Sequence, residues 1–331
     1  MSPVADRYAR GLRGAPVTSL WRRHAWLAYL AVLLGVFGHA SSEFVAVVSR
    51  VAGPELSVWR FTLGSAGLIV LSLLFADSRD LLAPLRAQGP RLVGLSLLGI
   101  TTGYLMFHWS LDFATVPQVA TTVTTIPIFV ALANLWINRQ PISGGRWLSG
   151  IAAVIGAALL LTDGYLARLA GDVNNLFGVL LAVGCAATVA AFMVWVRPLI
   201  AEYGALRITA ITLALGSVGL WLVVGISWDV WVNPATLFER PAPQVGALIT
   251  IALWNTTITQ FLWIGGLAAV PDITRGSYLF FLKPVIAVGL TLMFLGQPVT
   301  LMQWTAIGVI CGAVLVEMNW DRLTRARKPA V

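Results

Sequence analysis

The segment TIPIFVALANLWINRQPISGGRW at residues 125–147 recurs in similar form as FLKPVIAVGLTLMFLGQPVTLMQW at residues 281–304. Each copy reads as an apolar helix, a short turn and the beginning of another helix. With the chain shifted by 157 positions, the matching residues are Pro127 with Pro284, Gln140 with Gln297, Pro141 with Pro298, and Trp147 with Trp304. A repeat at a fixed distance indicates that the chain consists of two related halves.

The composition indicates a protein whose solvent is lipid. Of the 331 residues, 58% are hydrophobic and only 11% are charged, too few charges for a water-soluble surface. Uncharged runs of about 20 residues are long enough to span a bilayer as helices, which satisfy their own backbone hydrogen bonds. We therefore predict an all-α polytopic membrane protein with ten transmembrane helices, at residues 25–49, 56–76, 92–112, 115–137, 146–162, 175–199, 206–227, 244–267, 271–295 and 300–319.

Five spans in each half give the two halves opposite orientations, because an odd number of crossings ends on the other side of the membrane. Two inverted five-helix repeats are an architecture that secondary transporters use. The predicted organisation is a cytoplasmic N-terminal arm at 1–24, a first repeat at 25–162, an extracytoplasmic linker at 163–174, a second repeat at 175–319 and a cytoplasmic tail at 320–331.

The net charge of +8 follows from topology, since Lys and Arg are retained on the cytoplasmic side of a membrane. With the N-terminus inside, 16 of the 22 basic residues lie in cytoplasmic segments, and the outer side holds Arg50, Arg60, Arg168 and Arg240. No soluble domain offers a basic face for nucleic acid. We expect a bacterial inner-membrane protein with both termini in the cytoplasm.

Ionisable residues within spans are candidates for function, because each costs roughly 2.5–3.5 kcal/mol at a helix centre. Lys283 lies in the ninth span beside Pro284, which leaves a nearby carbonyl free to face a cavity. A structural ion pair or a snorkelling lysine is the alternative. His39 and Glu43 share one face of the first span and could bind an amino group or relay a proton. They could equally form a structural hydrogen-bonded pair.

Polar and aromatic side chains also gather in the third, fourth, eighth and ninth spans, where they suit an amphoteric ligand with a flat apolar part. The candidate substrate-binding residues are Lys283, His39, Glu43, Tyr104, His108, Trp254, Asn255, Tyr278, Trp263 and Thr121. Threonines often only bond to their own helix backbone, so part of this polar set is expected to be structural. Bends in the helices are expected at Gly99, Gly103, Pro127 and Pro284.

The sequence resembles the drug/metabolite transporter superfamily of EamA type from about residue 25 to residue 319. The resemblance rests on Trp59-Arg60-Phe61 at the start of the second span and on the two repeated hairpins quoted above. Within the superfamily the chain is most similar to YddG-type exporters of aromatic amino acids. The resemblance implies ten helices around a central cavity lined mainly by spans 1, 3, 4, 6, 8 and 9. Many relatives carry glutamate where this chain has Gln140 and Gln297.

Other classes of protein lack support in the sequence. There is no GxxxxGK[ST] segment for ATP hydrolysis, and three scattered histidines form no HExxH or other catalytic cluster. No cofactor or metal is expected, and Cys185 and Cys311 are interpreted as small apolar residues. We expect a secondary transporter, not an enzyme, that exports amino acids, aromatic or neutral, by alternating access. Export of another metabolite or drug, purine-like or cationic, stays open, as do a channel or receptor and the oligomeric state, monomer included.

The charge distribution makes a prediction about topology. Single cysteines placed in the N-terminal arm and after Trp320 are expected to react with a membrane-impermeant thiol reagent only from the cytoplasmic side. Labelling of intact spheroplasts and of inverted vesicles can be compared after Cys185 and Cys311 have been replaced by alanine. Labelling of either terminus in intact spheroplasts would contradict the inverted-repeat topology.

Overall fold

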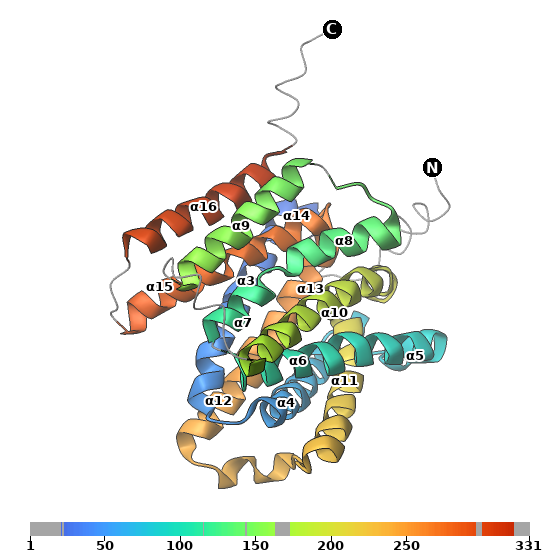
Figure 1. The fold of residues 1–331 in the computed structure, drawn as a ribbon. Helices are drawn as coiled ribbons and strands as arrows, with labels where there is room; N and C mark the ends of the chain where they lie inside the picture. The colour runs from blue at the N-terminus through green and yellow to red at the C-terminus, as the bar shows by residue number, and fades with distance from the viewer. Residues whose placement is uncertain are drawn as a thin grey trace.

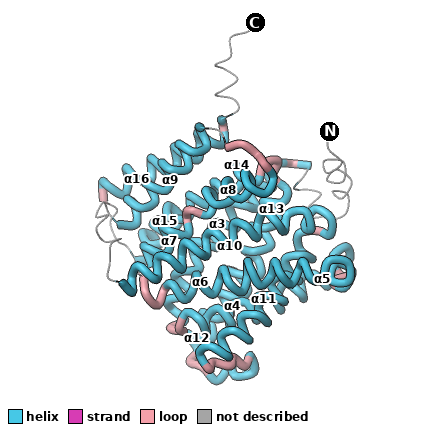
Figure 2. Tube along the Cα trace, turned by 45° about the vertical axis from the view of Figure 1, so that its right-hand side comes forward, coloured by secondary structure: helices cyan, strands magenta, loops and turns pink. Residues whose placement is uncertain are grey.

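The computed structural model describes residues 21, 23–114, 116–142, 144–162, 173–295 and 300–320, and every regular element within these ranges is helical (Figures 1 and 2). Seven of the described helical segments are long and apolar enough to cross a membrane. Three shorter apolar helices accompany them, at Ile126–Asn138, Trp147–Leu159 and Leu301–Val316. The predicted all-helical class is confirmed, whereas the count of ten spans stays a prediction.

The helices of the first half follow the predicted apolar runs closely. They are α3 (Ala25–Ser49), α4 (Gly53–Leu74), the short η1 (Ala76–Ser78), α5 (Leu82–Ser96), the π-helical turn η2 (Leu97–Thr102), α6 (Gly103–Ser110), α7 (Val116–Val123), α8 (Ile126–Asn138) and α9 (Gly144–Thr162).

The second half has a similar order of elements, with the additional 3-10 helix η6 before its last two helices. It contains α10 (Val173–Tyr203), α11 (Ala205–Trp228), η4 (Pro234–Glu239), α12 (Ala242–Ala252), the π-helical turn η5 (Leu253–Ile258), α13 (Thr259–Ala269), α14 (Ile273–Ser277), the 3-10 helix η6 (Tyr278–Leu282), α15 (Lys283–Leu295) and α16 (Leu301–Met318).

The fourth and ninth predicted spans are interrupted in the structure. The continuous helix expected at 115–137 divides into α7 and α8 just before Pro127, and the one expected at 271–295 passes through η6 just before Pro284. Proline donates no backbone hydrogen bond and clashes with the preceding turn, so a regular helix does not continue through it. The third helix also begins earlier than predicted, at Leu82 rather than residue 92, with a kink at Gln88.

Helices from the two halves interleave rather than forming separate bundles. In Figures 1 and 2, α9 and α16 lie side by side in the upper part of the molecule, and α4 and α11 lie together in the lower part. Between these two pairs, α3 packs on α13, and α10 packs on α6 and α8. The interior of the molecule is therefore built mainly from contacts between halves.

The pair of α4 and α11 shows a reciprocal set of contacts. The sequence LGSAGL at residues 63–68 of α4 recurs as LGSVGL at residues 215–220 of α11. Thr257, the fifth residue of η5, donates a hydrogen bond from its hydroxyl to the Gly64 carbonyl at 2.9 Å. Thr101, the fifth residue of η2, donates in the same way to the Gly216 carbonyl, also at 2.9 Å. Contacts exchanged in this way are what an approximate two-fold axis between the halves produces.

The contact between α3 and α13 depends on glycine. A Cβ atom added to Gly35 of α3 would lie 2.9 Å from the Cα atom of Trp263, and one added to Gly266 of α13 would lie 2.9 Å from the backbone nitrogen of Val32. Small residues at such a crossing let two membrane helices approach closely enough for their backbones to touch.

We predict that Gly35→Ala destabilises the protein by about 1–3 kcal/mol, because the new methyl group can be accommodated only if the two helices separate. Gly246→Ala is the matched control. A Cβ atom at Gly246 meets nothing within 4 Å, so this change is expected to leave stability unchanged or to raise it by up to about 1 kcal/mol. Thermal unfolding of both purified variants in detergent checks the prediction, and equal unfolding temperatures would contradict it.

Candidate functional site

A cavity lies among helices of both halves, at the place where α3, α4, α6, α7, α8, α10, α13, η6 and α15 meet. Its lining consists of His39, Ser42, Arg60, Tyr104, Phe107, Val123, Ile126, Cys185, Val189, Trp263, Phe280 and Lys283. The volume of about 30 Å³ accommodates water molecules but not an organic solute. The lining combines two cationic side chains, Arg60 and Lys283, with aromatic rings.

Lys283 is the first residue of α15 and lies at the cavity with only 3% of its surface exposed. Its Nζ atom lies 5.7 Å from the ring centroid of Phe107 and 5.6 Å from that of Phe280. Both distances suit attraction between an ammonium group and the electron-rich face of a ring. Lys283 stands between the end of η6 and Pro284, and these two features together fix the direction in which its side chain leaves the backbone.

Arg60 of α4 is 1% exposed and also lines the cavity, although the sequence analysis assigned it to the outer side of the membrane. The structure places it inside the protein, in α4, and not in a loop. Its Nε donates to Thr256 Oγ1 at 2.9 Å, and one Nη donates to the Asn255 carbonyl at 3.0 Å. The guanidinium carbon lies 5.9 Å from the ring centroid of Tyr104. Arg60 is thus bonded to η5, a turn of the other half.

His108 of α6 holds the same arginine from the opposite side. The second Nη of Arg60 lies 3.3 Å from His108 Nε2, and since a guanidinium only donates, Nε2 must accept. The ring proton then belongs to Nδ1, which lies 2.7 Å from Ser57 Oγ and 3.1 Å from the Tyr104 carbonyl oxygen and can donate to either. The Ser57 hydroxyl can donate onward to the Gly53 carbonyl at 3.1 Å. The geometry therefore assigns the neutral Nδ1–H tautomer to His108.

An aromatic cluster forms another wall of the cavity. The imidazole of His39 contacts the rings of Trp263 and Phe280 edge-on, with centroid distances of 5.7 and 5.6 Å. Trp263 and Phe280 are 5.1 Å apart in a tilted arrangement. Such edge-on and tilted geometries are the favoured ones for aromatic pairs. Tyr104 completes the wall, and its hydroxyl is hydrogen-bonded to the side-chain amide of Gln260, 2.5 Å away.

The structure thus brings together four of the residues singled out in the sequence, namely His39, Tyr104, Trp263 and Lys283, with His108 directly behind Arg60. Three others lie elsewhere. Trp254 and Asn255 hydrogen-bond to the Ser41 hydroxyl of α3, and Tyr278 stacks on Phe281. The side chains of Glu43 and Thr121 fall outside the described part of the structure.

Sequence reasoning missed Arg60 and Phe280 as lining residues. Arg60 could have been found, since it is a charge two turns into a helix that begins at Gly53, and charges within spans rarely face lipid. Phe280 carries no such signal. It reaches the cavity because η6 is wound more tightly than the neighbouring α-helices, which changes the direction of its side chain.

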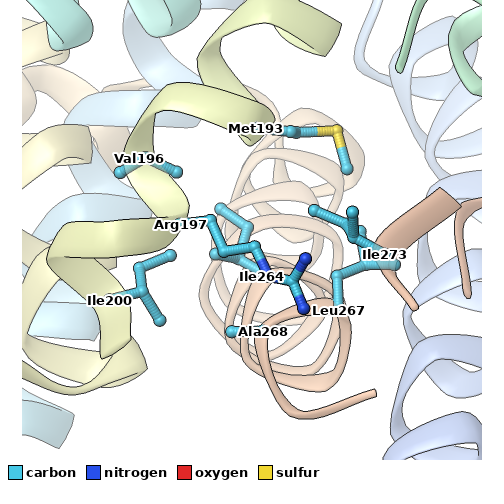
Figure 3. A pocket seen from close by; sticks show the side chains of 8 residues that line it. All are labelled: Met193, Val196, Arg197, Ile200, Ile264, Leu267, Ala268 and Ile273. Carbon is cyan, nitrogen blue, oxygen red and sulfur yellow. The ribbon is translucent and has the colours of Figure 1, made fainter. Parts of the chain in front are cut away.

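A second, smaller pocket differs sharply from the cavity. It lies between α10, α13 and α14 and is lined by Met193, Val196, Arg197, Ile200, Ile264, Leu267, Ala268 and Ile273 (Figure 3). Figure 3 shows the guanidinium of Arg197 reaching across among these apolar side chains. One of its Nη atoms lies 3.4 Å from the Val270 carbonyl. With a single polar side chain, this pocket offers little chemistry for recognising a polar substrate.

Apolar helices in this number, with buried cations around an internal cavity, define a polytopic membrane protein of the transporter class. The model of the EamA-like transporter family matches the chain at residues 26–162 and again at residues 176–318. The chain belongs to this family.

Individual relatives are similar over most of their length. The chain is 30% identical over 316 residues to a Pseudomonas aeruginosa protein named "Probable biotin transporter", covering 93% of this chain and 96% of the relative. It is 24% identical over 298 residues to the "Uncharacterized inner membrane transporter YicL" of Salmonella typhimurium, covering 90% and 95%. A solved crystal structure shares the fold with a TM-score of 0.71 at 15% identity, covering 92% of this chain and 99% of that one.

The position of His108 makes a prediction about stability. His108→Leu removes the acceptor of one Arg60 hydrogen bond and the donor to Ser57, a loss expected to cost about 1–3 kcal/mol for each buried polar group affected. His108→Gln keeps one acceptor and one donor on a side chain of similar reach and is expected to recover part of the loss. Thermal unfolding in detergent measures both variants. Unfolding of the leucine variant at the wild-type temperature would show that these bonds contribute nothing.

Proposed function

We propose that this chain is a secondary transporter that exports amino acids with aromatic or neutral side chains by alternating access around the cavity. The observation that carries the proposal is the lining itself, where Lys283 and Arg60 lie beside Tyr104, Trp263 and Phe280. In this proposal the protein lies in a bacterial inner membrane with both termini in the cytoplasm. The relative named as an inner-membrane transporter supports the location, and the two separate family matches support the two-repeat organisation.

The lining suits the two ends of such a substrate. A carboxylate would be attracted to the ammonium group of Lys283, and the interaction is strengthened because the site is shielded from bulk water. A flat apolar side chain would pack against the rings of Trp263 and Phe280. The imidazole of His39 and the hydroxyl of Ser42, which also line the cavity, can accept hydrogen bonds from an ammonium group.

Alternating access is supported by the size of the cavity and by the broken helices around it. A cavity of about 30 Å³ cannot enclose an amino acid, so binding requires the lining helices to separate. The interruptions at η2, η5 and η6 are places where a helix can change direction without breaking a complete hydrogen-bond ladder. Discontinuous helices of this kind surround the binding sites of many secondary transporters.

Biotin is a second candidate substrate, favoured by the Pseudomonas aeruginosa relative and its printed name. Biotin is a carboxylate with an apolar chain and a planar ureido group, and the same cations and rings could bind it. It lacks the ammonium group of an amino acid. The two candidates therefore predict different substrates for one cavity.

Efflux from proteoliposomes tests the proposal. Vesicles containing the purified protein are loaded with labelled tryptophan, phenylalanine, leucine or biotin, and loss of label is followed with and without unlabelled substrate outside. The proposal expects saturable efflux of the amino acids that outside substrate accelerates, which is the behaviour of a carrier and not of a channel. Exchange of biotin alone would favour the second candidate, and leakage at the rate of protein-free vesicles would reject both.

Lys283→Ala is expected to reduce amino-acid efflux at least about tenfold, because a charge-assisted contact to a carboxylate contributes about 1.5–3 kcal/mol. Lys283→Arg should restore little, since the guanidinium is broader and needs different geometry. Met293→Ala is the control, because Met293 lies on the same helix and is 81% exposed. Normal efflux by the alanine variant at equal amounts of protein would show that Lys283 has a structural role.

A further inference from the structure

The cavity is lined by equivalent positions of the two halves. The shift of 157 that aligns the repeated hairpins places Lys283 at the position of Ile126. The same shift places Phe280 at the position of Val123. All four residues line the cavity. The two interrupted helices therefore contribute matching positions to one site.

The helices that follow the π-helical turns contribute another such pair. Phe107 is the fifth residue of α6 and Trp263 is the fifth residue of α13, and both line the cavity. Tyr104 and Gln260, the second residues of these helices, are hydrogen-bonded to each other. Two equivalent residues can bond to one another only where the approximate two-fold axis passes between them. The axis therefore runs beside Tyr104, which also lines the cavity.

The helices α3 and α10 supply a further pair. Of the nine buried residues between Ala28 and Ser42 of α3, eight have a buried counterpart in α10 that lies 150 positions further along the chain. Because the buried face of a helix repeats with its turn, this agreement puts the two helices in register. His39 and Val189 are 150 positions apart, so they are equivalent, and both line the cavity.

The two sides of the cavity differ in chemistry although their positions match. The cationic wall consists of His39, Trp263, Phe280 and Lys283, from α3, α13, η6 and α15, and the apolar wall consists of the equivalent residues Val189, Phe107, Val123 and Ile126, from α10, α6, α7 and α8. The helices of each wall pack together, α3 on α13 and α15, and α10 on α6, α7 and α8. One backbone arrangement therefore carries two walls of different character.

This difference fixes how an amino acid lies in the cavity once the helices separate. Its charged groups are attracted to Lys283 on the cationic wall, and its side chain leaves the same tetrahedral carbon in another direction. A flat side chain then lies between the rings of the cationic wall on one face and the apolar wall on the other. A few polar groups that orient a ligand, opposite an apolar surface that accepts the rest of it, are the usual plan of a small-molecule site.

We propose that Val123, Ile126 and Val189 of the apolar wall are specificity-determining residues, which limit the size of the side chain that the transporter accepts. This inference rests on the proposed function, because it names the residues that contact the variable end of the proposed substrate. All three residues are buried and branched at Cβ, and such side chains have few rotamers with which to adjust to a larger ligand. The volume that they leave therefore sets the limit.

The test compares valine with tryptophan, which share their charged groups and differ in side-chain size. Binding of each to the purified protein in detergent is measured by calorimetric titration, and the ratio of the valine Kd to the tryptophan Kd gives the preference for the larger side chain. Val189→Phe should lower this ratio at least about tenfold, because tryptophan loses room that valine does not need. Val189→Ala enlarges the space and should raise the ratio about threefold to tenfold.

Val194→Ala is the matched control. Val194 is a buried valine of the same helix that does not belong to the cavity lining, so the loss of the same two methyl groups should leave the ratio at its wild-type value. A wild-type ratio in Val189→Ala would overturn the inference, and so would an equal change in Val194→Ala. If Val189→Phe elutes as aggregate, the two alanine variants decide.

The same titrations separate this inference from the proposed function. Wild-type protein that binds neither amino acid rejects the proposed function and this inference with it. Wild-type protein that binds both, with a ratio that neither change at Val189 alters, overturns the inference alone.

Discussion

Polar groups inside a helical membrane protein must find their partners within the protein, and this constraint shapes the interior of the molecule. The π-helical turn η5 shows how the constraint is met. A π-helical turn disturbs the regular pattern in which each carbonyl accepts from the residue four positions later. The hydroxyl of Thr256 donates to the carbonyl of Ile251 at 2.7 Å, and that of Thr259, directly after the turn, donates to the carbonyl of Trp254 at 2.8 Å. Side chains of the turn thus satisfy the backbone that the turn has loosened.

The same constraint explains how two cations are accommodated near one cavity. Arg60 is surrounded by fixed acceptors, and Lys283 lies against the faces of aromatic rings. Hydrogen-bond acceptors and the faces of aromatic rings both stabilise a cation inside a protein.

The sequence predicted the helical class and most helix bounds because each apolar run is long and its flanks are polar. It also predicted bends at Pro127 and Pro284, where the chemistry of proline is local, but it expected continuous helices and not the interruptions that the structure shows there. It could not tell which face of a helix turns toward the cavity, so Trp254, Asn255 and Tyr278 were selected together with Trp263 and Lys283. The comparison of the two halves did not find the recurrence of LGSAGL as LGSVGL, because the shift of 157 that aligns the repeated hairpins does not bring these segments into register.

Assignment of Arg60 to the outer side shows a limit of counting charges. The positive-inside rule treats every arginine near the end of a span as part of a loop. Arg60 lies near the start of the predicted span, yet its side chain reaches into the protein, because η5 of the other half provides the acceptors. Only the three-dimensional neighbourhood distinguishes an anchor at the membrane surface from a buried cation.

The hydrogen bonds between α4 and η5 show that the parts of the molecule that are held together differ from its two halves along the chain. Thr257 donates to the Gly64 carbonyl, and Arg60 donates to Thr256, so α4 is hydrogen-bonded to a segment that lies nearly two hundred residues further along the sequence. A rearrangement that moved the first five helices as one block would break these bonds and their counterpart between Thr101 and Gly216. In the proposed alternating access, the bodies that move past one another therefore each contain helices from both halves, with α4 carried by the neighbours of η5 and α11 by those of η2.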